Sequence, residues 1–151
     1  MKLYKSLENE LKILDKEEQL TMSAAMDALA NAYAPYSSFK VGAALLLENG
    51  EIIQGSNQEN VAYPSGTCAE RSALFTYGSS GKKAKIKILA ITALGKDGKR
   101  SETCSPCGGC RQVMVEYEKL QKKPYKVVFW FNGKLEVVHS STNLLPFSFH
   151  F

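Results

Sequence analysis

Two strand-like hydrophobic runs stand close together in the first third of the chain. They are residues 40–47 (KVGAALLL) and 51–57 (EIIQGSN), and the Asn49-Gly50 pair lies between them. An Asn-Gly pair supplies the positive backbone φ angles that a tight hairpin turn needs. The pattern therefore predicts an antiparallel hairpin over these two runs.

Three further runs are predicted to be strands. Residues 86–94 (IKILAITAL) are apolar at nearly every position, which is typical of a central strand covered on both faces. Residues 125–131 (YKVVFWF) and 134–140 (KLEVVHS) flank a second Asn-Gly turn, at Asn132 and Gly133. The chain is thus expected to form about five strands.

Helical spacing predicts three helices. Asp15 followed by Glu18 resembles a capping box that opens a helix over residues 16–33, which Pro35 stops. The segment 68–78 has apolar residues at helical spacing, namely Ala69, Ala73, Leu74 and Tyr77. A third helix over 107–120 is expected to bury Val113, Met114, Tyr117 and Leu120.

The order of these elements favours an α/β fold. Strands alternate with helices, so we expect a single mixed β-sheet of about five strands, covered by helices in three α/β/α layers. A chain of 151 residues without repeats or linkers is expected to be one domain, residues 1–151. Residues 1–15 are an uncertain N-terminal extension, and 1–14 are ambiguous, with an edge strand as one possibility.

Charge and hydropathy argue against two classes of protein, nucleic-acid-binding proteins and membrane proteins. The net charge of +4 comes with lysine clusters at 82–87 (KKAKIK) and 122–126 (KKPYK). Apolar residues alternate with these lysines, which favours solvated strand faces over a nucleic-acid site. The apolar runs are too short to cross a bilayer, and the N-terminus lacks the apolar region of a secretory signal. We expect a cytoplasmic protein with reduced thiols, and neither nucleic-acid nor membrane partners.

Four cysteines carry the sharpest chemical signal: Cys68, Cys104, Cys107 and Cys110. In a reducing compartment this spacing indicates a metal site, and thiolates favour zinc. Four cysteine ligands would form a closed structural site, whereas three would leave a position open for catalysis. Cys107 and Cys110 are one helical turn apart, but Cys104 lies in the preceding loop. Whether Cys104 also binds the metal is therefore left open by the sequence.

The residues around these cysteines resemble a known enzyme family. Cys68-Ala69-Glu70 followed by PCGGC at 106–110 is similar to the signature of zinc nucleobase deaminases. The blocks YSSFKVGAAL, GSNQENVAYPSGTCAERSAL, PCGGCRQV and LLPFSF together resemble the small homotetrameric cytidine deaminases. The resemblance extends from about residue 33 to the C-terminus and implies a cytidine deaminase-like fold.

The resemblance implies a hydrolytic reaction at one zinc ion per subunit. It assigns Cys68, Cys107 and Cys110 as the zinc ligands, and a bound zinc can lower the pKa of water to about 7. Glu70 would carry protons from the water to ring N3 and then to the departing amine. Cytidine and deoxycytidine would become uridine and deoxyuridine with release of ammonia, a reaction of pyrimidine salvage.

Hydrogen bonds from neighbouring side chains to the thiolate sulfur atoms are also expected. Three thiolates and one divalent ion sum to a negative charge, which hydrogen bonds to sulfur would reduce. Arg71 and Arg111 are placed in sequence to donate such bonds, and Gln112 is a further candidate.

The resemblance also implies a substrate site. Asn57 and Glu59 would bind the ribose 3′-hydroxyl, and Phe39 would pack on the pyrimidine. The backbone around Ala69 would contact the pyrimidine edge, and the Ser105 carbonyl would hold the leaving amine. A neighbouring subunit of the homotetramer would contribute Tyr63 and Phe149 to each site, with Phe147 as the alternative stacking ring.

Three other functions compete with this prediction. The enzyme could deaminate another cytosine-bearing compound, although the intact SNQEN motif argues for a ribose. A nucleic-acid editing enzyme would need a groove for flanking nucleotides, and this chain offers no extra domain or long basic loop to form one. A closed module with all four cysteines on zinc would bind a partner through the lysine clusters, and would leave Glu70, Asn57 and Glu59 without a role.

Overall fold

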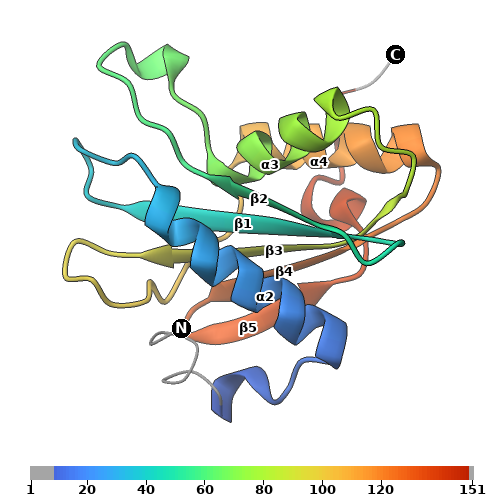
Figure 1. Cartoon of the computed structure of the whole chain (residues 1–151), viewed down its shortest axis with the longest axis horizontal. Helices are drawn as coiled ribbons and strands as arrows, with labels where there is room; N and C mark the ends of the chain where they lie inside the picture. The colour runs from blue at the N-terminus through green and yellow to red at the C-terminus, as the bar shows by residue number, and fades with distance from the viewer. Residues whose placement is uncertain (1–8, 150–151) are drawn as a thin grey trace.

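A computed structural model describes residues 9–149 of the chain (Figure 1). Its centre is a five-stranded sheet with the strand order β2-β1-β3-β4-β5. The strands are β1 (Lys40–Leu47), β2 (Ile52–Ser56), β3 (Ile86–Leu94), β4 (Lys126–Phe131) and β5 (Lys134–Val138). The predicted number of strands and the two predicted hairpins are therefore confirmed.

The sheet is mixed because one pair of neighbouring strands is parallel and the other pairs are antiparallel. β1 pairs antiparallel with both β2 and β3, and β4 pairs antiparallel with β5. β3 and β4 are parallel, since the chain between them crosses back through a helix. The two predicted Asn-Gly turns have positive φ at Gly50, Asn132 and Gly133.

Helices cover both faces of the sheet, as predicted for three layers (Figure 1). They are α2 (Lys16–Ala28), α3 (Ala69–Ser79) and α4 (Gly108–Gln121). Among residues 9–149 there are also three short 3₁₀ segments, Leu29–Asn31, Tyr63–Ser65 and Ser141–Leu144. α2 lies across one face, and α3 and α4 lie side by side on the other.

Two glycines allow the helices to approach the sheet closely. A Cβ atom on Gly42 of β1 would lie 2.1 Å from the carbonyl oxygen of Ala25 in α2. A Cβ atom on Gly55 of β2 would lie 2.4 Å from the backbone of both Ala69 and Ala73 in α3. Backbone therefore packs directly on backbone at both contacts, which fixes where the N-terminus of α3 stands over β2.

The ends of the elements differ slightly from the expectation. The capping box is confirmed, because Asp15 Oδ1 accepts from the Glu18 backbone N–H and Glu18 Oε2 accepts from that of Asp15. The first helix ends earlier than residue 33, since α2 passes into the 3₁₀ segment that stops at Asn31. Residues 9–11 are helical, so they form no edge strand, and residues 1–8 of that prediction lie outside the described residues.

The prediction of which residues the third helix buries was wrong at one position. In α4, Met114 is buried as expected, and Val113 and Tyr117 are half-buried. Leu120, however, is 68% exposed, and Val115 and Glu118 are buried instead. The Glu118 carboxylate accepts hydrogen bonds from the backbone N–H and the hydroxyl of Ser141, so a polar anchor for the C-terminal segment replaces an apolar contact.

In the part of the chain that the structure describes, no helix has the length and apolar character needed to cross a membrane.

Candidate active site

Two helix N-termini bring three cysteines together. Cys68 is the N-cap of α3, Cys107 is the N-cap of α4, and Cys110 lies in the first turn of α4. Neither N-cap side chain makes a capping hydrogen bond with the backbone of its helix, so both sulfur atoms are left for other partners. The three Sγ atoms all lie within 4.8 Å of one another, with 3.5 Å between those of Cys107 and Cys110.

This cluster fits a zinc ion. Zinc binds thiolate sulfur at about 2.3 Å in a tetrahedron, which places the sulfur atoms a little under 4 Å apart. The separation of 3.5 Å between Cys107 and Cys110 is close to that value, all three sulfur atoms lie within 4.8 Å, and the donors are the soft ligands that zinc prefers. Three thiolates would leave a fourth ligand position on the zinc free, and Cys68 and Cys107 are part of the pocket lining.

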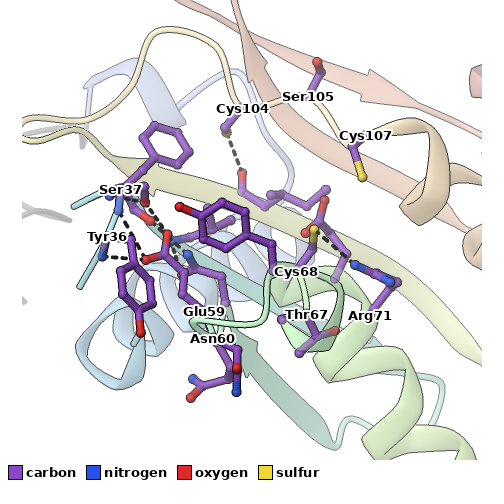
Figure 2. Close-up of a pocket in the computed structure, with 18 residues that line it drawn as sticks. Tyr36, Ser37, Glu59, Asn60, Thr67, Cys68, Arg71, Cys104, Ser105 and Cys107 are labelled. Atoms are coloured by element: carbon purple, nitrogen blue, oxygen red, sulfur yellow. Dashed lines mark hydrogen bonds between the residues drawn. The ribbon is translucent and has the colours of Figure 1, made fainter. Parts of the chain in front are cut away.

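Cys104 lies apart from this cluster (Figure 2). Its thiol donates a hydrogen bond to the carbonyl oxygen of Ile91 at 3.6 Å, and its backbone N–H donates to the carbonyl oxygen of Trp130 at 2.9 Å. The side chain is buried, and this desolvation raises the pKa of the Cys104 thiol to about 11. A neutral thiol bonded to the sheet is a poor zinc ligand.

Arg71 supplies positive charge to the cluster. Its Nη2 atom donates a hydrogen bond to Cys68 Sγ at 3.7 Å from the same turn of α3 (Figure 2). A hydrogen bond from the Cys110 thiol, followed by that of Arg71, lowers the pKa of Cys68 to about 5. The thiolate in turn raises the pKa of the Arg71 guanidinium. The structure thus places Arg71 in the predicted contact with a sulfur atom.

Glu70 lies next to the cluster without belonging to it. It occupies the first turn of α3, its side chain is only 5% exposed, and it lines the pocket. Burial raises the pKa of this carboxyl group, and the nearby Cys68 thiolate adds to the effect. A carboxyl group with a raised pKa can both accept and return a proton near neutral pH.

A pocket of about 630 Å³ opens in front of these residues (Figure 2). This volume is in the range of small-molecule sites. Of the predicted site residues, the lining contains Phe39, Asn57, Glu59, Tyr63, Cys68, Glu70, Arg71, Ser105 and Cys107. Sequence reasoning therefore located nine of the eighteen residues that line this pocket.

Asn57 and Phe39 are held together by hydrogen bonds. Asn57 Nδ2 donates to the Phe39 carbonyl oxygen at 2.9 Å, and Asn57 Oδ1 accepts from the Val41 backbone N–H at 2.8 Å. The amide thus extends the pairing of β1 and β2 beyond the last residue of β2. It also fixes the backbone from which the Phe39 side chain extends.

Glu59 faces the turn that precedes β1. Its Oε2 atom accepts from the backbone N–H groups of Tyr36 at 2.9 Å and Ser37 at 3.2 Å, and Oε1 accepts from the Ser37 hydroxyl (Figure 2). The hydroxyl bond of Ser37, with the two N–H bonds, lowers the pKa of Glu59. The carboxylate is therefore ionised and acts as a hydrogen-bond acceptor.

Arg111 and Gln112 have contacts other than the predicted ones. Arg111 Nε donates to the Pro106 carbonyl oxygen at 2.8 Å, and its Nη1 donates to that of Leu144 at 3.2 Å. Gln112 exchanges two hydrogen bonds with the backbone of Phe149, at 2.9 and 3.0 Å. Both side chains tie the C-terminal segment to α4, and the structure records no bond from either of them to a sulfur atom.

The remaining predicted site residues differ in how exposed they are to solvent. Ser105 is half-buried in the pocket wall, and Tyr63 stands 78% exposed at the rim. Ala69 is fully buried beneath β2 and is not part of the lining. Phe149 is 68% exposed and Phe147 is 98% exposed, and both lie outside this pocket.

Sequence reasoning missed several lining residues. They are Tyr36, Ser37, Val41, Gln58, Asn60, Gly66, Thr67 and Ile91. Gln58 and Thr67 exchange two backbone hydrogen bonds of 2.9 Å, which join the end of β2 to the loop before Cys68. Proximity in the sequence to YSSF, SNQEN and GTCAE was the signal that could have found most of them.

Comparisons with known proteins agree with this geometry. Residues 15–127 match the family model described as "Cytidine and deoxycytidylate deaminase zinc-binding region". A cytidine deaminase of Halalkalibacterium halodurans is 42% identical over 109 residues, which are 72% of this chain and 78% of the relative. A cytidine deaminase of Mycobacterium tuberculosis is 39% identical over 103 residues, 68% of this chain and 73% of the relative.

Solved structures show the same similarity. The crystal structure of cytidine deaminase from Burkholderia pseudomallei has a TM-score of 0.73 and 37% sequence identity, covering 90% of this chain and all of that chain. The structure of cytidine deaminase from Mycobacterium tuberculosis has a TM-score of 0.67 and 30% identity, covering 91% of this chain and 100% of the other. This chain therefore belongs to the cytidine and deoxycytidylate deaminase family.

Proposed function

We propose that this protein is a zinc-dependent hydrolase that converts cytidine and deoxycytidine, with water, to uridine and deoxyuridine and ammonia. The observation that carries the proposal is the open cluster of three sulfur atoms beside a buried glutamate in a pocket of nucleoside size. The family match and the cytidine deaminases among the relatives support the same reaction.

In this proposal each subunit holds one zinc ion through Cys68, Cys107 and Cys110. When bound, zinc supplies a hydroxide nucleophile at neutral pH. Glu70 accepts one proton of the water and delivers it to ring N3 of the cytosine, and it then passes the second proton of that water, from the hydroxyl added at C4, to the departing amine. Arg71 reduces the negative charge of the thiolates through its bond to Cys68.

The rest of the pocket would bind the nucleoside. Phe39 packs on the pyrimidine, while Asn57 and Glu59 face the ribose. The backbone around Ala69 meets the pyrimidine edge, and the Ser105 carbonyl accepts from the leaving amine. The hydrogen bonds that hold Phe39, Asn57 and Glu59 in one group support a common binding role.

Charge favours a nucleoside over a nucleotide as the substrate. Glu59 and Glu70 line the pocket, and Arg71, which is bonded to Cys68, is the single cation among the described residues of the lining. A 5′-phosphate would therefore meet carboxylates and find no free cation to pair with. Deoxycytidylate is accordingly the weaker of the two substrates that the family description names.

The exposed aromatic residues support a shared active site in a homotetramer. Tyr63, Phe147 and Phe149 expose large apolar rings, and Gln112 fixes the backbone of Phe149 so that the tail has a defined course on α4. Exposed apolar groups of this kind are typical of interfaces between subunits. In this proposal Tyr63 and Phe149 complete the pocket of a neighbouring subunit.

Free cysteines on an enzyme of this chemistry fit a reducing compartment. The four cysteines form no disulfide in the structure, and an oxidised pair could not ligate zinc. We therefore place the enzyme in the cytoplasm, where it would serve pyrimidine salvage.

The test of this function is an absorbance assay on the purified protein with its zinc content measured. Cytidine, deoxycytidine and deoxycytidylate are offered separately, and ammonia is quantified in each reaction. Loss of the cytidine band with an equal amount of ammonia supports the proposal. Turnover of deoxycytidylate alone would show that the nucleotide is the substrate, and no turnover of any compound by zinc-loaded protein would reject deamination.

A further inference from the structure

The turn before β1 and the loop after β2 are joined by a group of hydrogen bonds around one serine. Ser37 is half-buried in the pocket wall, 22 residues before Glu59 in the sequence. Its hydroxyl donates to Glu59 Oε1, and its backbone N–H donates to Glu59 Oε2 at 3.2 Å. The neighbouring N–H of Tyr36 donates to the same Oε2 atom at 2.9 Å.

The same hydroxyl also accepts a hydrogen bond. The backbone N–H of Phe39 donates to Ser37 Oγ at 3.0 Å, and the carbonyl oxygen of Phe39 accepts from Asn57 Nδ2 at 2.9 Å. The backbone of Phe39 is thus held on both sides. Ser37 connects it to Glu59, and Asn57 connects it to the end of β2.

The turn also holds one residue in an unfavourable backbone conformation. Ser38, between Ser37 and Phe39, has a φ angle of 56°, in the left-handed region that residues other than glycine rarely adopt. Its backbone N–H donates to the Ala34 carbonyl oxygen at 3.1 Å. The strained residue persists only while neighbouring contacts hold it, and the Ser37 hydroxyl makes two of those contacts.

The carboxylate of Glu59 has a limited number of acceptor positions. A carboxylate offers about four lone-pair sites, and the turn occupies three of them. The three donors fix the plane of the carboxylate, so the remaining position has a defined direction in the pocket. A sugar hydroxyl that donates to Glu59 would have to meet that direction.

We propose that Ser37 is a positioning residue that couples the Phe39 ring to the Glu59 carboxylate, so that the base-binding and sugar-binding parts of the pocket form as one unit. This inference rests on the proposed function, since it assigns the pocket to a nucleoside. The hydroxyl of Ser37 bonds Glu59 and the backbone of Phe39, and none of the three cysteines. Its removal should therefore weaken binding of the sugar most, through Glu59, and binding of the base less, through Phe39, while leaving the chemistry intact.

The experiment compares three variants with the wild-type enzyme. Ser37→Ala removes the hydroxyl, and Ser37→Thr retains one. Ser80→Ala is a matched control, because Ser80 Oγ also donates one bond, to the Tyr77 carbonyl oxygen at 2.7 Å, and accepts one from a backbone N–H two residues later, that of Lys82. Ser80 lies at the end of α3 and outside the pocket. Zinc content and thermal unfolding are measured for every variant.

The kinetic readout separates positioning from a general structural role. For cytidine, Ser37→Ala should raise KM by about tenfold, as expected for one lost hydrogen bond to a charged group, with kcat within about twofold of wild type. For 2′,3′-dideoxycytidine, which lacks the hydroxyls that Glu59 would bind, the same variant should change KM much less. Ser37→Thr should restore most of the cytidine KM, and Ser80→Ala should match wild type with both substrates.

Two results would overturn the inference. Equal losses with cytidine and the dideoxy compound would mean that Ser37 does not act through Glu59, and a KM for Ser37→Ala equal to that of Ser80→Ala would mean that it positions nothing. Both leave cytidine turnover by the wild type, and hence the proposed function, intact. If the wild type shows no turnover, the proposed function fails, and the role of Ser37 is then tested by the dissociation constant of uridine. Weaker uridine binding to Ser37→Ala alone would support the positioning role, and unchanged binding would reject it.

Discussion

The guanidinium of Arg71 and the sulfur of Cys68 lie 3.7 Å apart, Nη2 to Sγ, within one turn of α3. This contact couples a proposed zinc ligand to a positive charge that belongs to the same helix. In the proposed site, the residue that follows the buried glutamate would thereby compensate part of the charge that three thiolates create. Its position explains why a thiol, a carboxylate and a guanidinium stand within four residues of the sequence.

Replacing Arg71 by Gln should weaken zinc binding. The thiolate of Cys68 would lose its charged donor, and its pKa would rise towards the ordinary value of a thiol, so protons would compete better with the metal. We expect a loss of zinc affinity of about tenfold to a hundredfold. Competition with a chromophoric chelator measures it. Lys119→Gln, which removes an exposed positive charge from α4, is the control, and equal affinities in the two variants would contradict the role of Arg71.

Removal of the Cys104 thiol should leave the metal in place. In Cys104→Ala the protein loses the hydrogen bond to the Ile91 carbonyl oxygen and some buried volume, which should lower the free energy of unfolding by about 1–2 kcal/mol. Zinc content should stay at one per chain, whereas Cys107→Ala should lose it. Elemental analysis with urea denaturation checks both statements. Loss of zinc from Cys104→Ala would instead establish a fourth ligand.

The two close-packing glycines should differ in their effect on the metal. A Cβ atom at Gly42 or Gly55 would lie 2.1 or 2.4 Å from helix backbone, so each alanine variant should lose stability, by about 1–3 kcal/mol or more. Gly55 supports α3, which carries Cys68, whereas Gly42 supports α2 on the opposite face of the sheet. Zinc affinity of the folded protein should therefore fall in Gly55→Ala alone. A fall of the same size in Gly42→Ala would show that the effect is general destabilisation.

Release of the C-terminal segment should affect substrate binding and not the metal. Gln112→Ala removes the two bonds that hold the Phe149 backbone to α4. If Phe149 completes a neighbouring pocket, the KM for cytidine should rise several-fold, and Phe149→Ala should have a similar effect. Light scattering shows whether the assembly persists in each variant. An unchanged KM in both variants would exclude Phe149 from the site, and Phe147→Ala would then test the alternative ring.

Local patterns predicted the elements of this fold well. The Asn-Gly turns and the Asp15–Glu18 capping box depend on neighbouring residues, so sequence alone shows them. Leu120 was placed wrongly because helical spacing cannot reveal that Glu118, a charged residue, would be buried to hold Ser141. That contact joins residues 23 positions apart and exists only in the folded chain.

Some residues of the candidate site could likewise be predicted from local sequence, and others could not. The cysteines and Glu70 stand in short motifs whose chemistry can be read from residue types and spacing. Ser37 was missed because its partners, above all Glu59, are distant in the sequence. The contacts of Arg111 and Gln112 with Leu144 and Phe149 were likewise set by the course of the C-terminal segment, which no local pattern describes.

The most direct test of the account is replacement of Glu70 by Gln, which keeps the shape of the side chain and removes its ability to carry a proton. Glu116→Gln, an exposed position on α4, is the control. Zinc content and the absorbance of cytidine are followed for both variants and the wild type. We predict equal zinc in all three proteins and a loss of turnover of at least about a hundredfold in Glu70→Gln alone. Turnover by Glu70→Gln at the wild-type rate, with the same zinc content, would contradict the assignment of Glu70 as the proton carrier.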